Sequence, residues 1–149
     1  MRIIVILLVL SLPFLVISWD FKEQKLVVDD SLIAEIKQGD GGAIIIGDGG
    51  SRVGEIKDEG NRFAIYDGHK KEKGSLTNEG EVYDEKGNLI YTVKIAEGRV
   101  YDKNGDLAFS INKTGRVYNS RGDEIARILN YDKFLFEGVM LVVFFSDLI

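Results

Sequence analysis

The chain of 149 residues has no cysteine, one proline and one histidine. Without cysteine, disulfides, thiolate chemistry and a lipid anchor on an N-terminal cysteine are excluded. The single histidine, His69, lies in the polar run 67–73, which argues against a histidine metal centre, and no serine has the setting of a nucleophile elbow. We therefore expect no catalytic residue, no metal and no cofactor.

Basic residues are not in excess either. The chain carries 19 Lys and Arg against 24 Asp and Glu, for a net charge of −5. Because such a chain is not attracted to phosphates at long range, we expect no nucleic-acid partner. An apolar share of 45% with 29% charged residues is ordinary for a folded globular protein.

The N-terminal segment is the first long apolar run. Residues 3–17 are almost entirely apolar, which is short for a membrane span of roughly 20 residues and typical of a signal-peptide core. Val16 and Ser18 suit the small-residue positions of a cleavage site, which would leave Trp19 as the first residue. We predict a signal peptide at 1–18 and an exported protein that is periplasmic, envelope-associated or secreted. An uncleaved signal anchor is the alternative.

A unit of 17 or 18 residues repeats through the middle of the chain. Three copies begin at Gly80, Gly98 and Gly115 and share Val-Tyr-Asp/Asn-x-x-Gly followed by an apolar stretch. Looser copies occupy 42–59 and 60–79. We predict a hairpin-repeat domain over 42–133. The entry segment before it, 19–41, contains either a degenerate sixth hairpin or a single entry strand.

Each unit has the composition of a β-hairpin. The residues on both sides of the turn are mostly β-branched or aromatic, which suits a half-buried strand. An Asp or Asn side chain can accept backbone hydrogen bonds within the turn, and the following glycine can take the positive φ that such turns require. The predicted structural turn residues are Asp84, Gly87, Asp102, Gly105, Asn119 and Gly122.

A single hairpin is marginally stable, so the units must share an apolar interior. We predict an all-β fold, a ring of about five β-hairpin repeats around a common core. The expected core residues are Ile56, Val82, Val93, Val100, Ile111, Val117 and Ile128.

The repeated unit, over residues 42–128, resembles the bacterial β-flower proteins of the 5-fold type. The resemblance implies hairpin petals about a pseudo-symmetry axis. That family has no established biochemical activity, so the resemblance implies no catalytic residue. The stretch 70–73 departs from the pattern and lengthens the second unit. The units at Tyr83 and Tyr101 also resemble the tyrosine-aspartate repeats of large secreted shell proteins, which contain many more copies.

The C-terminal segment, 134–149, is again apolar but is interrupted by Glu137 and Gly138. Its longest uninterrupted run, 139–145, is too short to span a bilayer. We expect this closing segment to pack on or in the ring, as a closing strand or as a plug along the axis. A tail that docks to a membrane or a partner is the alternative, and the pattern does not decide between strand and helix.

Four tyrosines recur beside the turns and are the candidate residues for a ligand or partner: Tyr66, Tyr83, Tyr101 and Tyr118. Outward-facing rings could stack on sugars or hold a protein, whereas the interpretation we favour is that they cover hairpin edges or fill the core. The turn aspartates Asp48, Asp67, Asp84 and Asp102 form a possible acidic rim, but repetition at one turn position favours a structural role.

Two Gly-Asp-Gly-Gly stretches, at 39–42 and 47–50, lack the regular spacing of a calcium-binding repeat and are better explained as turns. The sequence thus predicts an exported, non-catalytic structural or interaction module of the bacterial envelope, with an unknown protein or glycan as partner. It would meet a membrane only through the signal segment or the apolar tail. The alternative is a carbohydrate-binding or carbohydrate-processing protein that uses the tyrosines and turn aspartates.

Overall fold

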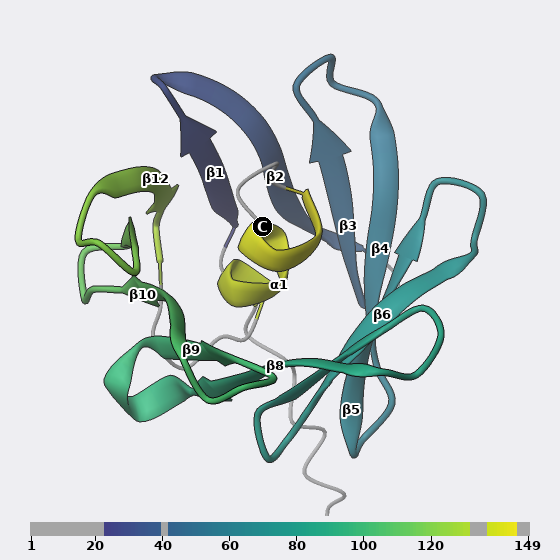
Figure 1. Ribbon diagram of the computed structural model, residues 1–149. Helices are drawn as coiled ribbons and strands as arrows, with labels where there is room; N and C mark the ends of the chain where they lie inside the picture. The colour runs from purple at the N-terminus through teal and green to yellow at the C-terminus, as the bar shows by residue number, and fades with distance from the viewer. Residues whose placement is uncertain (1–22, 40–41, 132–136, 146–149) are drawn as a thin grey trace, which may run out of the picture.

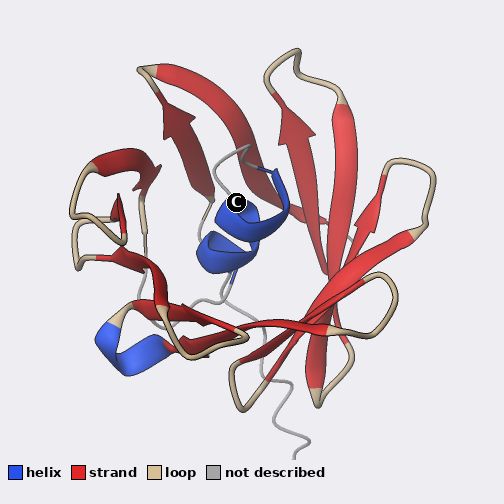
Figure 2. Ribbon diagram, viewed as in Figure 1, coloured by secondary structure: helices blue, strands red, loops and turns tan. Residues whose placement is uncertain are grey.

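The computed structural model describes residues 23–39, 42–131 and 137–145. Twelve antiparallel strands follow one another around a closed barrel, and the first strand pairs with the last (Figure 1, Figure 2). The strands are β1 Gln24–Val28, β2 Ser31–Gly39, β3 Gly42–Gly47, β4 Arg52–Asp58, β5 Arg62–Asp67, β6 Glu72–Thr77, β7 Glu81–Asp84, β8 Leu89–Lys94, β9 Arg99–Asp102, β10 Leu107–Ile111, β11 Arg116–Asn119 and β12 Glu124–Leu129. A short 3₁₀ helix, η1 Ile95–Glu97, and an α-helix, α1 Glu137–Phe145, complete the described chain.

The five predicted repeats form the hairpins β3–β4, β5–β6, β7–β8, β9–β10 and β11–β12. The described part of the entry segment adds a sixth hairpin, β1–β2, whose turn residues Asp29 and Asp30 have φ values of 48° and 60°. Two consecutive positive φ angles are typical of a type I′ turn, which needs no Asp-x-x-Gly sequence. The described ring therefore contains six hairpins, not the five that the β-flower resemblance implies, and the entry segment forms the sixth hairpin instead of a single entry strand.

The repeat turns have the predicted chemistry. The Asp84 carboxylate accepts hydrogen bonds from the backbone N–H groups of Lys86 at 2.8 Å and Asn88 at 2.9 Å, and Gly87 has a φ of 81°. These bonds satisfy donors inside the turn, and glycine adopts the positive φ without a Cβ clash. The same arrangement is repeated at Asp102 with Gly105 and at Asn119 with Gly122.

The barrel interior is the shared core that the repeats require. All seven predicted core residues, Ile56, Val82, Val93, Val100, Ile111, Val117 and Ile128, are buried in one apolar cluster. Successive side chains of a strand point to opposite faces, so the residues next to them in each strand lie on the outer wall.

Helix α1 lies inside the ring of strands (Figure 1). Val139, Met140 and Val142 belong to the same buried cluster as the inward residues of the barrel. The described part of the predicted closing segment, 137–145, is thus a helix that plugs the barrel and not a closing strand. The other residues of 134–149 lie outside the described residues.

Two glycines of the wall make room for the plug. A Cβ added to Gly74 of β6 would lie 2.5 Å from the ring of Phe144, and one added to Gly54 of β4 would lie 3.3 Å from the ring of Phe145. Both added atoms would also collide with a backbone carbonyl of the neighbouring strand. Glycine inside a strand often marks such a close approach.

The predicted signal peptide, 1–18, lies outside the described residues. Among the helices that the structure does describe, none has both the length and the apolar character needed to cross a bilayer.

Candidate binding groove on the barrel wall

A groove crosses the outer wall where β5, β6 and β7 lie side by side. Because Leu76 and Val82 point into the core, the alternation of the strands turns Ser75, Thr77 and Tyr83 outward. The groove has a volume of about 500 Å³. It is lined by Arg62, Glu72, Ser75, Thr77, Tyr83, Asp84, Glu85, Lys86 and Gly87.

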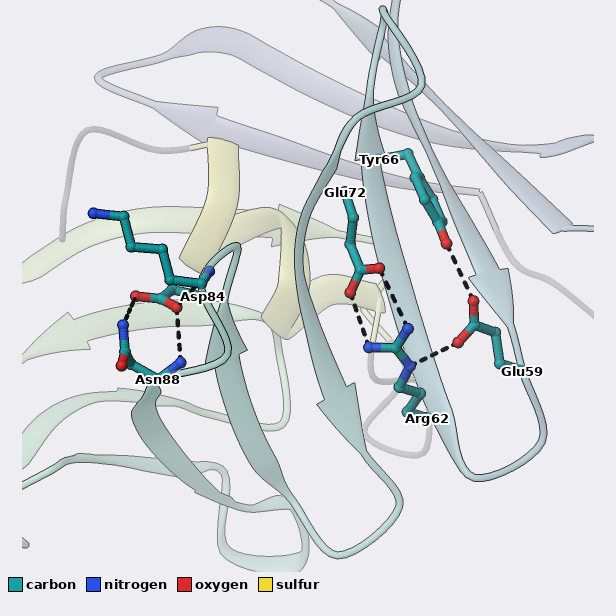
Figure 3. Close-up of polar contacts among 7 residues, drawn as sticks. Glu59, Arg62, Tyr66, Glu72, Asp84 and Asn88 are labelled. Atoms are coloured by element: carbon teal, nitrogen blue, oxygen red, sulfur yellow. Dashed lines mark hydrogen bonds and ion pairs between the residues drawn. The ribbon is translucent and has the colours of Figure 1, made fainter.

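Arg62, at the start of β5, holds one wall of the groove in place. Its guanidinium donates to both carboxylate oxygens of Glu72, at 2.8 and 3.3 Å, and its Nε donates to Glu59 at 2.6 Å (Figure 3). The second Glu59 oxygen accepts the Tyr66 hydroxyl at 3.1 Å. The hydrogen bond from Arg62 lowers the pKa of the Glu59 carboxyl, and burial followed by the bond to Glu59 raises the pKa of Tyr66.

The β7–β8 turn, which begins at Asp84 (Figure 3), also contributes to the lining. Within it the Glu85 carboxylate pairs with Lys71 at 2.8 Å and Lys73 at 3.7 Å, both from the β5–β6 hairpin. The bond from Lys71 lowers the pKa of the Glu85 carboxyl. These ion pairs link the turn to the neighbouring hairpin.

Tyr83 presents an aromatic ring to the groove. Its hydroxyl donates to Glu81 at 2.8 Å, and this bond raises the pKa of Tyr83. Ser75, which pairs with Tyr83 across β6 and β7, is only 3% exposed and forms the floor. A ring, hydroxyl groups and an arginine–carboxylate pair therefore surround one space.

The lining has almost no net charge. Arg62 and Lys86 are positive, whereas Glu72, Asp84 and Glu85 are negative. The hydrogen bonds of Asp84, first from Asn88, lower the pKa of that carboxyl, as Lys71 does for Glu85. Carboxylates of lowered pKa accept hydrogen bonds but are poor proton donors, so this arrangement suits binding better than acid catalysis.

The structure does not bring the four candidate tyrosines together. All four are half-buried outside the core, because each follows an inward residue in its own hairpin. Tyr83 lines the groove and Tyr66 joins the Arg62 network beside it, whereas Tyr101 and Tyr118 lie on β9 and β11, farther around the barrel. Lysine ammonium groups lie over two of the rings, Lys57 at 4.9 Å from Tyr66 and Lys94 at 5.2 Å from Tyr101.

Six residues of the groove were not among the predicted ones: Arg62, Glu72, Ser75 and Thr77 of the second and least regular repeat, and Glu85 and Lys86 of the third. The available signal was the pair of opposite charges, Arg62 and Glu72, placed on the two strands of one predicted hairpin. Of the turn aspartates, Asp67 accepts backbone N–H groups from His69 and Lys71, as a structural turn residue does. The described part of the chain contains no group of three or more His, Cys, Asp or Glu placed to hold a metal ion.

A second hollow, of about 370 Å³, lies at the β1–β12 seam. It is lined by Val27, Asp29, Asp30, Glu124, Ile125, Ala126 and Arg127. Acidic side chains dominate its polar lining and no aromatic ring contributes. The groove at Tyr83 is the stronger candidate, because it combines several kinds of recognition group.

Comparison with known proteins supports the fold alone. No family model and no curated protein matches the chain. The structure is similar to the X-ray structure of a protein from Arabidopsis thaliana, with a TM-score of 0.54 and 18% sequence identity over 80% of this chain and 88% of the other. At this identity the similarity shows a shared barrel architecture and nothing about a ligand.

Proposed function

We propose that this chain is an exported, non-catalytic interaction module of the bacterial envelope, which holds a protein or glycan partner in the groove at Tyr83. The observation that carries the proposal is the groove itself, where nine side chains and turn residues surround a space of about 500 Å³. The apolar segment at 1–18 supports export.

The groove is well prepared for binding. The Arg62 guanidinium is held by two carboxylates and the β7–β8 turn is held by ion pairs to Lys71 and Lys73. Side chains that are already ordered lose less conformational entropy when a partner binds, which leaves more of the contact energy for affinity.

Binding also fits the ionisation of Asp84 and Glu85 better than glycoside hydrolysis does. A glycosidase needs one carboxyl with a raised pKa to protonate the leaving group. The shifts at Asp84 and Glu85 have the opposite direction. We therefore propose that the protein recognises its partner without changing it chemically.

The test is capture from a detergent-solubilised envelope fraction with three immobilised proteins. These are the wild type, the groove variant Tyr83→Ala/Lys86→Ala, and a matched control, Tyr118→Ala/Arg121→Ala, which alters the same two positions of the fifth repeat. We expect the wild type and the control to retain the same component and the groove variant to lose it. Equal retention by all three proteins, or by none, would contradict the proposed function.

A further inference from the structure

We infer that the groove binds an uncharged glycan chain, with the Tyr83 ring stacked on a sugar face and the Arg62–Glu72 pair bonded to sugar hydroxyls. This assignment rests on the proposed function and names the class of its ligand. Four properties of the wall support it: the charge balance, the pairing of donors with acceptors, the ring of Tyr83, and the closure of the barrel.

Charge balance favours a neutral ligand. The lining contains two cationic and three anionic side chains. Some of them already form ion pairs within the protein: Arg62 pairs with Glu59 and Glu72, and Glu85 pairs with Lys71 and Lys73. Opposite charges this close cancel each other's field beyond a few ångströms, so the groove has little long-range attraction for an anionic or cationic polymer. What remains is local hydrogen bonding.

The hydrogen-bonding pattern suits vicinal hydroxyl groups. Arg62 uses three of its N–H groups on Glu59 and Glu72, and a third of its side chain, 33%, remains exposed. Glu72 is 35% exposed, and its carboxylate has more acceptor sites than the two bonds from Arg62 use. A hydroxyl both donates and accepts, so adjacent sugar hydroxyls can bond to the cation and the carboxylate at once.

The Tyr83 ring supplies the apolar part of the contact. Its hydroxyl is held by Glu81, which fixes the ring beside the hydroxyl groups of Ser75 and Thr77. Sugars have an apolar C–H face as well as a hydroxyl rim, and an aromatic side chain offers a large, rigid surface with a polar end. Ring and hydrogen-bonding groups thus match the two faces of a pyranose.

Barrel closure argues against an extended peptide as the ligand. A peptide bound as an added strand needs an unpaired strand edge, on which main-chain hydrogen bonds provide the affinity. Each of the twelve described strands has a neighbour on both sides, so none of them offers such an edge. The contacts that remain on this wall come from side chains, and the hydroxyl groups of a glycan can form hydrogen bonds with them.

The experiment measures oligosaccharide binding by isothermal titration calorimetry and by amide chemical shifts. The probes are chito-, cello- and malto-oligosaccharides, all of which are uncharged. We expect at least one probe to bind the wild type and to shift amides at 62, 72, 75, 77 and 83. Tyr83→Ala should bind it about tenfold more weakly, as loss of an aromatic contact predicts. Tyr83→Phe should bind nearly as well as the wild type, since its ring is intact, and Tyr118→Ala should be unchanged.

Thermal unfolding of each variant separates loss of binding from loss of folding. If Tyr83→Ala does not fold, the amide shifts of the wild type still test the site, because a probe that binds without shifting the amides at 62, 72, 75, 77 and 83 overturns the assignment. Binding that is equal in wild type and Tyr83→Ala, or no binding by any probe, overturns the glycan assignment. If in addition the envelope capture still depends on Tyr83 and Lys86, the proposed function stands with a different class of partner. If that dependence is also absent, both fail.

Discussion

Gln24 should destabilise the barrel, and replacing it with methionine should make the protein more stable. Its side chain on β1 is fully buried, 0% exposed, and points inward beside Leu26. Neither its amide nitrogen nor its amide oxygen has a hydrogen-bond partner in the described protein. A buried polar group of this kind costs about 1–3 kcal/mol, because it leaves its water partners without gaining others.

Methionine has a similar length and volume and no amide, and it adapts easily to the shape of a core. Gln24→Met should therefore increase the free energy of unfolding by about 1–3 kcal/mol. For a domain of this size that gain corresponds to a rise in Tm of roughly 3–10 °C. The assay is urea unfolding followed by circular dichroism, with a higher midpoint and an unchanged m value as the expected result.

The matched control is Gln38→Met on β2, where the same side chain is exposed. Surface substitutions of this kind change stability by about 0.5 kcal/mol or less. A lower midpoint for Gln24→Met than for the wild type would refute the reasoning. It would show that the amide has a hydrogen-bond partner in the folded protein, such as a buried water, which methionine cannot bind.

Three further outcomes follow from the structure. Gly74→Ala should destabilise the protein by about 1–3 kcal/mol in urea unfolding, because the new Cβ would lie 2.5 Å from the Phe144 ring. The control Gly49→Ala should leave stability unchanged, because the space around Gly49 is open. Equal urea midpoints for the two variants would contradict the packing of α1 against β6. Asp84→Asn should be as stable as the wild type at pH 7 and should lose less stability between about pH 5 and 3. The reason is that the pKa of Asp84 is lowered in the folded state. The stabilisation that the Asp84 carboxylate provides is therefore complete above its unfolded pKa of about 3.9 and is lost as the pH falls through its folded pKa. Parallel pH profiles of the urea midpoint would contradict it. Mass spectrometry of protein recovered from the envelope or medium should show Trp19 as the first residue, and a retained N-terminus would instead support a signal anchor.

The local features of this protein could be predicted from the sequence. Turn chemistry depends on a few adjacent residues, so Asp84 and Gly87 and their repeats identified the hairpins correctly. The alternation of apolar side chains depends only on strand geometry, so core residues such as Val100 and Ile128 were also correct. The β1–β2 hairpin was left open, since its Asp29–Asp30 turn shares no motif with the repeats.

Only the tertiary structure decided how the hairpins close and what surrounds the groove. Closure requires β1 to pair with β12 across about a hundred residues of chain, and no local pattern specifies that pairing. The groove combines Arg62 and Glu72 of one hairpin with Tyr83 of the next, and the sequence alone does not show which neighbouring side chains face the same space. The helical state of 137–145 likewise depends on the enclosed lumen, where a helix satisfies its own backbone hydrogen bonds without needing a neighbouring strand.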